Sequence, residues 1–274
     1  MLTYTEKSCS PLIAGTLRYN VRKDVVQYCN GEKWLSLVVE YSPDSLDDNA
    51  VNNPASSCLA LSKLKGYKPG VYWIKPSSNY PAFQTYCKEG GWTLLMKIDG
   101  AKQTFHYDSP LWTSNSSFNE NNVNFDQNEA KLASFWTLPF KEILVGMKTG
   151  HEINYVSLPK NAKSLRDVLR HNTYHQTSIG RSTWKSLVPG SSLQPYCNTE
   201  GFNVGMRSKV RIGIVSNQEN ECHSPDSFIG LGAKHHLTIC GKLYATNSCG
   251  NLAACAPVDN GLKNLFSIGY VFAR

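Results

Sequence analysis

Nine cysteines constrain this 274-residue chain more than any other feature of its sequence. None lies in a Cys-x-x-Cys pair, the usual signature of zinc ribbons and thioredoxin-like redox sites. Widely spaced cysteines are typical of disulfides that tie strands and loops together in an oxidising compartment. Because the number is odd, one cysteine is left as a free thiol or bonded to another molecule. The nine are Cys9, Cys29, Cys58, Cys87, Cys197, Cys222, Cys240, Cys249 and Cys255.

The cysteine pattern indicates a secreted, extracellular protein. Residues 1–9, MLTYTEKSC, contain no apolar stretch, so we expect that no signal peptide is present in this sequence. No run of 18 apolar residues occurs, so we expect no membrane span. Asn115-Ser116-Ser117 is an N-glycosylation sequon, which is typical of a surface loop in a secreted glycoprotein.

The net charge of +7 is spread over the whole chain. Aromatic residues do not interleave with the basic ones as they do in proteins that bind single-stranded nucleic acid. Alternation along residues 207–214 instead predicts a strand with a solvated basic face and a buried apolar face. The basic face holds Arg207, Lys209 and Arg211, and the apolar face holds Val210, Ile212 and Ile214. We therefore expect no nucleic-acid partner.

Residues 1–40 are expected to form a small β-hairpin module. Asn30-Gly31 is a strong hairpin signal between two short strands. A bond between Cys9 and Cys29 would close a loop at the entry of the module, so these two are its natural partners. The module contains so few core residues that it needs such a bond, or docking, for stability. Strands are expected at residues 15–19, 24–29 and 33–38.

Residues 41–57 lack Lys and Arg, are rich in Asp, Asn, Ser and Pro, and predict a linker. The main domain then covers residues 58–274. Asp126 and Ser164 are expected to cap two helices, because each has an acidic residue three positions later. Residues 216–264 predict a long loop region that is functional or held by disulfides. Strands are expected at residues 71–74, 82–87, 92–98, 142–148, 210–215 and 265–272, with Trp92, Leu94, Met96 and Ile98 on one face.

No motif for catalysis is present. Neither a GxSxG nucleophile elbow nor a glycine-rich phosphate loop occurs. His151-Glu152 begins like the zinc motif HExxH, but Tyr155 stands where the second histidine belongs. We therefore expect a protein that is not an enzyme, because nucleophile, base and orienting group are not visible together.

One segment is rich in oxygen-bearing side chains, the ligands that calcium prefers. It covers residues 216–226 and reads either as a loop that binds a ligand or calcium, or as a polar turn without a ligand. Calcium is the one candidate cofactor. The candidate ligand residues are Asn217, Glu219, Glu221, His223, Asp226 and, from a nearby segment, His235.

At the start of the main domain, Gly70-Val71-Tyr72-Trp73-Ile74-Lys75-Pro76 lies between Cys58 and Cys87, and Gly90-Gly91-Trp92-Thr93-Leu94 follows. This arrangement resembles the opening of a fibrinogen C-terminal-like domain. The resemblance implies that Cys58 and Cys87 bond to each other. It also implies that the two glycines lead into a central strand headed by Trp92-Thr93.

The C-terminal half resembles two other groups. Cys222 and Phe228-Ile229-Gly230-Leu231-Gly232 are similar to a segment of the intelectin lectins. Intelectins hold a sugar diol on calcium, and the corresponding positions here are His223, Asp226, Lys234 and Lys242. Two lysines repel calcium. Arg211-Ile212-Gly213-Ile214, Ser224-Pro225-Asp226-Ser227, Ser248-Cys249-Gly250-Asn251 and Ile268-Gly269-Tyr270-Val271 resemble cnidarian extracellular proteins, including coral skeletal organic matrix proteins.

Cys197 and Cys222 are expected to pair across the strands between them. Cys240, Cys249 and Cys255 then leave one pair and one odd cysteine. A Cys249–Cys255 bond closes a short loop and a Cys240–Cys249 bond a longer one, and the sequence does not choose. The odd cysteine is a candidate for an intermolecular disulfide, for example in a homo-oligomer.

Together these features predict an α+β fold of the fibrinogen C-terminal-like type. The expected domain has a mixed, mainly antiparallel sheet, few short helices and long disulfide-held loops, and the β-hairpin module precedes it. The resemblances imply a secreted, non-enzymatic matrix or recognition protein, such as a component of a skeletal organic matrix that takes part in biomineralization. The alternative is a lectin-like protein of innate recognition. Its partners are expected to be extracellular matrix proteins or glycans.

Overall fold

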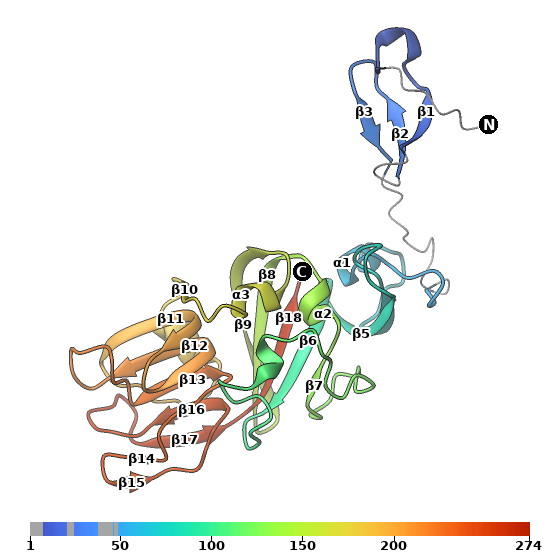
Figure 1. The fold of residues 1–274 in the computed structure, drawn as a ribbon. Coiled ribbons are helices and arrows are strands. Elements are labelled where there is room, and N and C mark those ends of the chain that lie inside the picture. Colours follow the sequence, from blue (N-terminus) through green and yellow to red (C-terminus); the bar gives the residue numbers. More distant parts are fainter. Residues whose placement is uncertain (1–7, 21–24, 38–45, 47–48) are drawn as a thin grey trace. The chain divides into compact units, whose positions relative to one another are not determined.

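The structure is a computed structural model that describes residues 8–20, 25–37, 46 and 49–274 (Figure 1). The chain divides into two compact units, Met1–Tyr41 and Ser42–Arg274. The fold is α+β, with mostly antiparallel sheets, few short helices and four disulfides. The expected linker at residues 41–57 lies partly outside the described residues.

The first unit contains one three-stranded antiparallel sheet, with β2 in the centre. Asn30 builds the turn after β2, because its side-chain oxygen accepts hydrogen bonds from the backbone N–H groups of Glu32 and Lys33. Gln27 and Cys29 are the only buried residues among those described in this unit, so the sheet has little core of its own. The elements are η1 (Pro11–Ile13), β1 (Leu17–Asn20), β2 (Val25–Cys29) and β3 (Trp34–Ser36). Asp24 and Val38, at the ends of two expected strands, lie outside the described residues.

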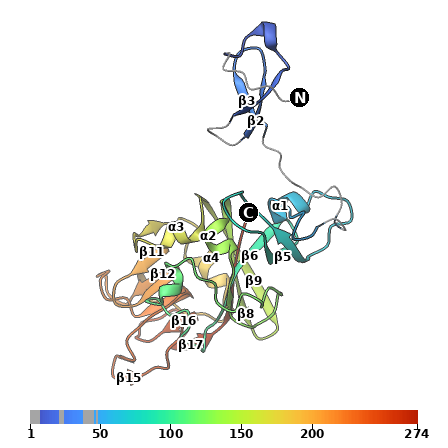
Figure 2. The ribbon, with the colours of Figure 1, turned by 45° about the vertical axis from the view of Figure 1, so that its right-hand side comes forward.

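The larger unit contains two principal antiparallel sheets (Figures 1 and 2). The seven-stranded sheet has the order β4 (Gly70–Ile74), β5 (Phe83–Lys88), β6 (Trp92–Asp99), β18 (Ile268–Ala273), β8 (Phe140–Thr149) and β9 (Glu152–Ala162), with β7 (Ala130–Lys131) paired to β6. The C-terminal strand β18, drawn red, lies between β6 and β8. The last residues of the chain therefore complete the centre of a sheet that begins with β4.

The second sheet has the order β10 (His175–Gln176), β11 (Tyr196–Gly205), β12 (Lys209–Asn217), β13 (Ser227–Leu231), β16 (Cys249–Ala253) and β17 (Lys263–Phe266). A separate hairpin consists of β14 (Thr238–Ile239) and β15 (Lys242–Leu243). The largest hydrophobic core draws on both principal sheets, with Met96 and Val145 from one and Ile212 and Ile229 from the other. The two sheets of this unit therefore share one core.

Strand β6 is buried on both faces, which differs from the single apolar face predicted by alternation. Trp92 and Leu94 belong to one core cluster, whereas Met96 and Ile98 belong to another. The pairing of β6 with β18 skips Leu95, and this bulge reverses the alternation along the strand. A one-residue shift of this kind leaves no signal in the hydrophobic pattern.

Residues 216–264 contain β13 to β16 and the start of β17, so the expectation of one long loop region is wrong. Disulfides do hold the region as expected, through Cys222 and through Cys240–Cys255. Three glycines lie in register across β12, β13 and β16, with Gly213 opposite Gly230 and Gly230 opposite Gly250. A Cβ atom on Gly213 would lie 2.3 Å from the carbonyl oxygen of Ile229. Glycine inside a strand ordinarily destabilises the strand. Here the row of glycines lets three strands approach closely.

Every helix described is short: η3 (Pro110–Trp112), α1 (Cys58–Leu61), α2 (Ser134–Thr137), α3 (Leu165–Leu169) and α4 (Arg181–Ser186). Ser164 caps α3 as predicted, because its hydroxyl accepts a hydrogen bond of 3.1 Å from the N–H of Asp167. Asp126 caps no helix, since its carboxylate binds the ammonium group of Lys97. Within the described residues, no helix is long and apolar enough to cross a membrane.

Candidate functional site

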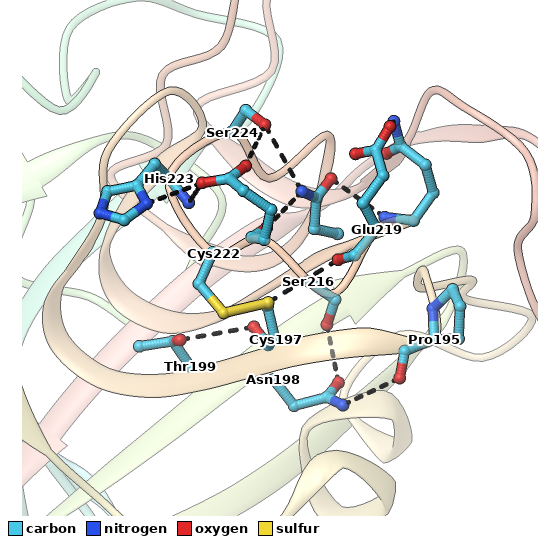
Figure 3. The surroundings of a disulfide bond; sticks show 12 residues. Pro195, Cys197, Asn198, Thr199, Ser216, Glu219, Cys222, His223 and Ser224 are labelled. Atoms are coloured by element: carbon cyan, nitrogen blue, oxygen red, sulfur yellow. Dashed lines mark hydrogen bonds and ion pairs between the residues drawn. A yellow bond between two sulfur atoms is a disulfide. The ribbon is translucent and has the colours of Figure 1, made fainter.

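The polar segment singled out from the sequence forms the connection between β12 and β13, here called the 218–226 loop. Figure 3 shows that a disulfide ties Cys222 in this loop to Cys197 at the start of β11. Cys197 has a φ of +53° and lies in an irregularity of the β11–β12 pairing, so β11 bends where the disulfide attaches. The loop is therefore fixed at both ends by strands and near its middle by a covalent bond.

Glu221 organises the tip of the 218–226 loop through hydrogen bonds to His223 and Ser224. One carboxylate oxygen accepts hydrogen bonds from the backbone N–H of His223 at 2.6 Å and lies 2.7 Å from its Nδ1 atom. The other accepts the hydroxyl of Ser224 at 2.7 Å. The Ser224 hydroxyl and the His223 N–H lower the pKa of this carboxyl group. Both oxygens of Glu221 are thus used within the loop.

The chemistry of this cluster differs from that of a nucleophilic triad. In a triad, histidine lies between the serine hydroxyl and the carboxylate, and removes the serine proton. Here the hydroxyl of Ser224 donates directly to Glu221, and His223 binds the other oxygen of the same carboxylate. The histidine is therefore not placed to activate the serine.

Two further side chains hold the start of the loop. The amide nitrogen of Asn217 donates to the carbonyl oxygen of Glu221 at 2.5 Å, and its amide oxygen accepts the N–H of Gln218 at 3.0 Å. Beneath the disulfide, the hydroxyl of Ser216 donates to the amide oxygen of Asn198 at 2.8 Å (Figure 3). Glu219 accepts the amide of Gln218 at 2.9 Å. Exposed polar groups are thus presented on a braced backbone.

Asp226, His235 and Asn217 are buried, whereas Glu219, Glu221 and His223 are exposed. Within the described residues, Oδ1 of Asp226 and Nε2 of His235 make no hydrogen bond. Burial raises the pKa of Asp226 and lowers that of His235, so burial favours the neutral form of each. The 218–226 loop therefore holds Glu219, Glu221 and His223 at the surface and Asp226 in the interior. Asn217 is buried at the end of β12, and His235 is buried outside the loop.

A calcium site needs several oxygen ligands around one point. Among the described residues, one group of three metal-ligating side chains lies together: Asp226, Cys240 and Cys255, with ligand atoms within 4.8 Å of one another. Cys240 and Cys255 are bonded to each other, so they offer no thiolate to a metal. Glu219 and Glu221 belong to no such group in that part of the chain. The described part of the loop thus presents exposed polar side chains that do not converge on one point.

The structure contains the three expected disulfides, Cys9–Cys29, Cys58–Cys87 and Cys197–Cys222. The fourth joins Cys240 to Cys255, so both pairings considered for the last three cysteines are wrong. Cys249 is free and buried in β16. A Cβ atom on Gly269 would lie 2.6 Å from its sulfur and 2.8 Å from Leu231, which shows how closely the thiol is enclosed. It is therefore not exposed to a second chain, and an intermolecular disulfide through it does not fit this structure.

The sequon residue Asn115 is exposed. Two cations fix the backbone just before it: the ammonium of Lys131 donates to the carbonyl oxygen of Ser114, and Nε of Arg166 donates to that of Thr113, each at 2.8 Å. Glycosylation of Asn115 stays a prediction. The geometry leaves its amide open to solvent on an anchored segment.

Several buried polar side chains gave no sequence signal. Glu200 accepts four hydrogen bonds, from Thr177, Ile179, Gly180 and Trp184. Arg211, expected on a solvated face, is only 3% exposed. Its partners include an atom of Tyr107, 104 positions earlier in the chain. Contacts over such separations leave no pattern in a local stretch of sequence.

A scan against models of protein families matches none, and a search of curated proteins finds no match at the level tested. The features of the chain that bear on its function are therefore its cross-links, the 218–226 loop and its charged side chains.

Proposed function

We propose that this protein is secreted and acts by binding, as a non-enzymatic component of an extracellular matrix or as a recognition protein. The observation that carries the proposal is the set of four disulfides, one in the first unit and three in the larger one. Cytosolic reductants keep most thiols reduced, whereas disulfides persist outside the cell. Eight of the nine cysteines are bonded and the ninth is buried. This pattern is expected of a protein that folds in an oxidising compartment.

The same proposal includes a fibrinogen-like or intelectin-like domain in the larger unit. Support comes from the Cys58–Cys87 bond and from Gly91, which leads into β6 with a φ of +75°. A Cβ atom on Gly91 would lie 2.7 Å from the Cα of Leu59, so the packing beside this disulfide requires glycine. These features agree with the motif that suggested the family.

A skeletal organic matrix is the most concrete setting for such a protein. Direct contact with carbonate mineral favours acidic proteins, whereas this chain carries a net charge of +7. The charge suits binding to acidic macromolecules of the matrix better than crystal nucleation. We therefore propose a role between other matrix components.

Peptide mapping of the native protein without reduction tests the proposal. After alkylation of free thiols and digestion, we expect four cross-linked peptide pairs and label on Cys249 only after unfolding. Mapping should join Cys240 to Cys255 and Cys197 to Cys222. Native protein whose nine thiols are all alkylated without reductant would contradict an extracellular protein.

The second candidate is a lectin-like protein that depends on calcium. The observation in its favour is the braced 218–226 loop, whose exposed side chains include Glu221 and His223. A glycan array with and without a chelator separates it from the first candidate. Binding that disappears with the chelator, and with Glu221→Gln but not with Glu120→Gln, supports the calcium-dependent lectin. Binding that survives the chelator supports the first proposal.

A further inference from the structure

The larger unit contains a buried guanidinium group with unused donors. Nε of Arg211 donates to the carbonyl oxygen of Tyr107 at 2.8 Å. Nη1 donates to the side-chain oxygens of Asn172 at 2.6 Å and Asn203 at 2.7 Å. Arginine has five N–H donors, and Nη2 makes no hydrogen bond within the described part of the chain. No carboxylate in that part forms an ion pair with Arg211, although a buried charge is ordinarily paired.

Two lysines lie beside Arg211. The guanidinium carbon of Arg211 lies 4.1 Å from the ring centre of Tyr107, and the Nζ atom of Lys209 lies 5.3 Å from the same ring. Lys209 and Lys234 face each other across a backbone bridge, with reciprocal hydrogen bonds of 2.9 Å. Like charges placed opposite each other on neighbouring strands destabilise the pair. Arg211 and Lys209 therefore lie against one aromatic ring, and Lys234 lies opposite Lys209.

The negative charge nearby does not balance them. Asp108 binds the ammonium of Lys234 in an ion pair whose side chains are about half exposed, 45% and 54%. Burial lowers the pKa of Arg211, which reflects the penalty of holding its charge there, while Tyr107 and Asp108 act in the opposite direction. One carboxylate thus lies near three cations, and an anionic group of a bound ligand would reduce the excess of positive charge.

We propose that Arg211, Lys209 and Lys234 bind the sulfate or carboxylate group of an acidic glycan. Nη2 of Arg211 supplies two donors and the lysines supply charge. The amide nitrogen of Asn172, on an exposed residue, is free to donate to a neighbouring hydroxyl or acid oxygen. A set consisting mostly of donors matches an oxyanion, and arginine binds such groups with both nitrogens of its fork.

A glycan fits this site better than an acidic peptide. Protein partners ordinarily bury apolar anchor residues at the centre of an interface. The described residues 99–112 and 207–234, which carry the three cations, contain no exposed large apolar side chain. Tyr174, Met206 and Leu237 are exposed just beyond these ranges and the neighbouring Asn172. The cations themselves are thus surrounded mainly by polar groups, which suits the hydroxyl groups of a sugar.

The test is titration calorimetry of the full disulfide-bonded chain at low ionic strength. The probes are a sulfated hexasaccharide, a carboxylated one, a neutral one, inorganic sulfate and a hexaglutamate peptide. We expect both acidic hexasaccharides to bind more tightly than inorganic sulfate, the neutral sugar not to bind, and affinity to fall with salt. The sulfated and carboxylated arms identify which acid is preferred.

Three variants make the test specific to this site. Arg211 also holds Tyr107 and Asn203, so its replacement endangers the fold, and Lys209→Glu carries the test instead. We expect Lys209→Glu to weaken binding by about tenfold or more. Lys242→Glu makes the same change in net charge on β15 and is expected to have little effect. Asp108→Asn removes the competing carboxylate and should strengthen binding, which a merely structural role would not do.

Some results would overturn the site. These are equal weakening by Lys209→Glu and Lys242→Glu, tighter binding of the peptide than of either acidic sugar, or binding of inorganic sulfate with no gain from the sugar. The inference rests on the proposed extracellular function and names its ligand class, yet the two fail separately. If the disulfides are intact but no glycan binds, only the proposed site is refuted. If the native thiols are reduced but binding depends on this site, only the extracellular role is refuted.

Discussion

Two parts of the larger unit show different ways to hold a polar chain segment. The connection between β6 and β7, residues 100–129, contains no cysteine and is held by buried lysines. Lys97 binds Asp126 and the carbonyl oxygen of Asn124, and Lys131 binds the carbonyl oxygen of Ser114. The segment from β11 to β16 is instead held by two disulfides and by buried amides.

The two kinds of anchor make the two parts sensitive to different solution conditions. A buried ammonium must carry a charge in the interior, so a segment that depends on it becomes sensitive to pH. A disulfide carries no charge, so it is insensitive to pH in the same way. It is broken by reduction, so its segment responds to reductant. The first part should therefore change with proton concentration and the second with redox potential.

The largest effect is expected from Asn251→Ala, which tests whether disulfides alone hold the second part. The buried Asn251 amide accepts the N–H of Ser192 at 2.9 Å and donates to the carbonyl oxygens of Ser192 and Phe228, each at 2.8 Å. Leaving these groups unpaired should lower the free energy of unfolding by about 4 kcal/mol. Urea denaturation measures it, with the exposed Asn220→Ala as control. A change below about 1 kcal/mol would mean that the cross-links suffice.

The next effect concerns the disulfide at the 218–226 loop. Replacing both Cys197 and Cys222 by serine should lower the free energy of unfolding by about 3 kcal/mol, because the unfolded chain gains freedom over a loop of 25 residues. Hydrogen exchange should rise in residues 217–226 and stay unchanged in residues 100–129. Equal loss of protection in both segments would show that the two parts are not held independently.

The third prediction addresses the lysine-held part. Burial lowers the pKa of Lys131 from 10.5 to about 7. Since the folded pKa is depressed, protonation favours the unfolded chain, and the protein loses stability as pH falls from about 10 towards 7. Between about pH 9 and pH 6, the free energy of unfolding of Lys131→Met should therefore fall by roughly 2 kcal/mol less than that of the wild type.

Thermal and urea unfolding of this variant at several pH values measure the effect. Lys102→Met removes the same charge from a side chain that is 56% exposed and serves as the control. Parallel pH profiles for the wild type and Lys131→Met would refute a buried ammonium as the cause.

The smallest effect is expected at Asp226, in the disulfide-held part. Burial raises its pKa above the ordinary value, so stability is greatest at low pH and falls as the carboxyl group ionises. Asp226→Asn should therefore stabilise the protein by about 1 kcal/mol at neutral pH and have less effect at acid pH. Denaturation at both pH values, beside the exposed Glu219→Gln, measures it. Destabilisation at neutral pH would indicate a hidden partner for the carboxylate.

Strands with local alternation and the disulfides of the first half were predictable. Residues 71–74 lie within β4, and the predicted strand 82–87 overlaps β5 from residue 83 onward. The cap at Ser164 depends on a residue only three positions away. The Cys58–Cys87 pair came from a family motif. The bulge at Leu95, the strands in residues 216–264 and the Cys240–Cys255 pair were not predictable, because each depends on the register between strands distant in sequence.

The sequence by itself determined that this chain is cross-linked, mostly β and without a visible catalytic motif, because these properties reside in residue types and short spacings. Only the tertiary structure decided which side chains are buried from solvent. Arg211 reads as one of three alternating surface cations, yet the fold buries it against Tyr107, and among the described residues its Nη2 has no hydrogen-bond partner. Burial depends on what packs above a residue, and the segment that covers Arg211 comes from a part of the chain about a hundred residues away.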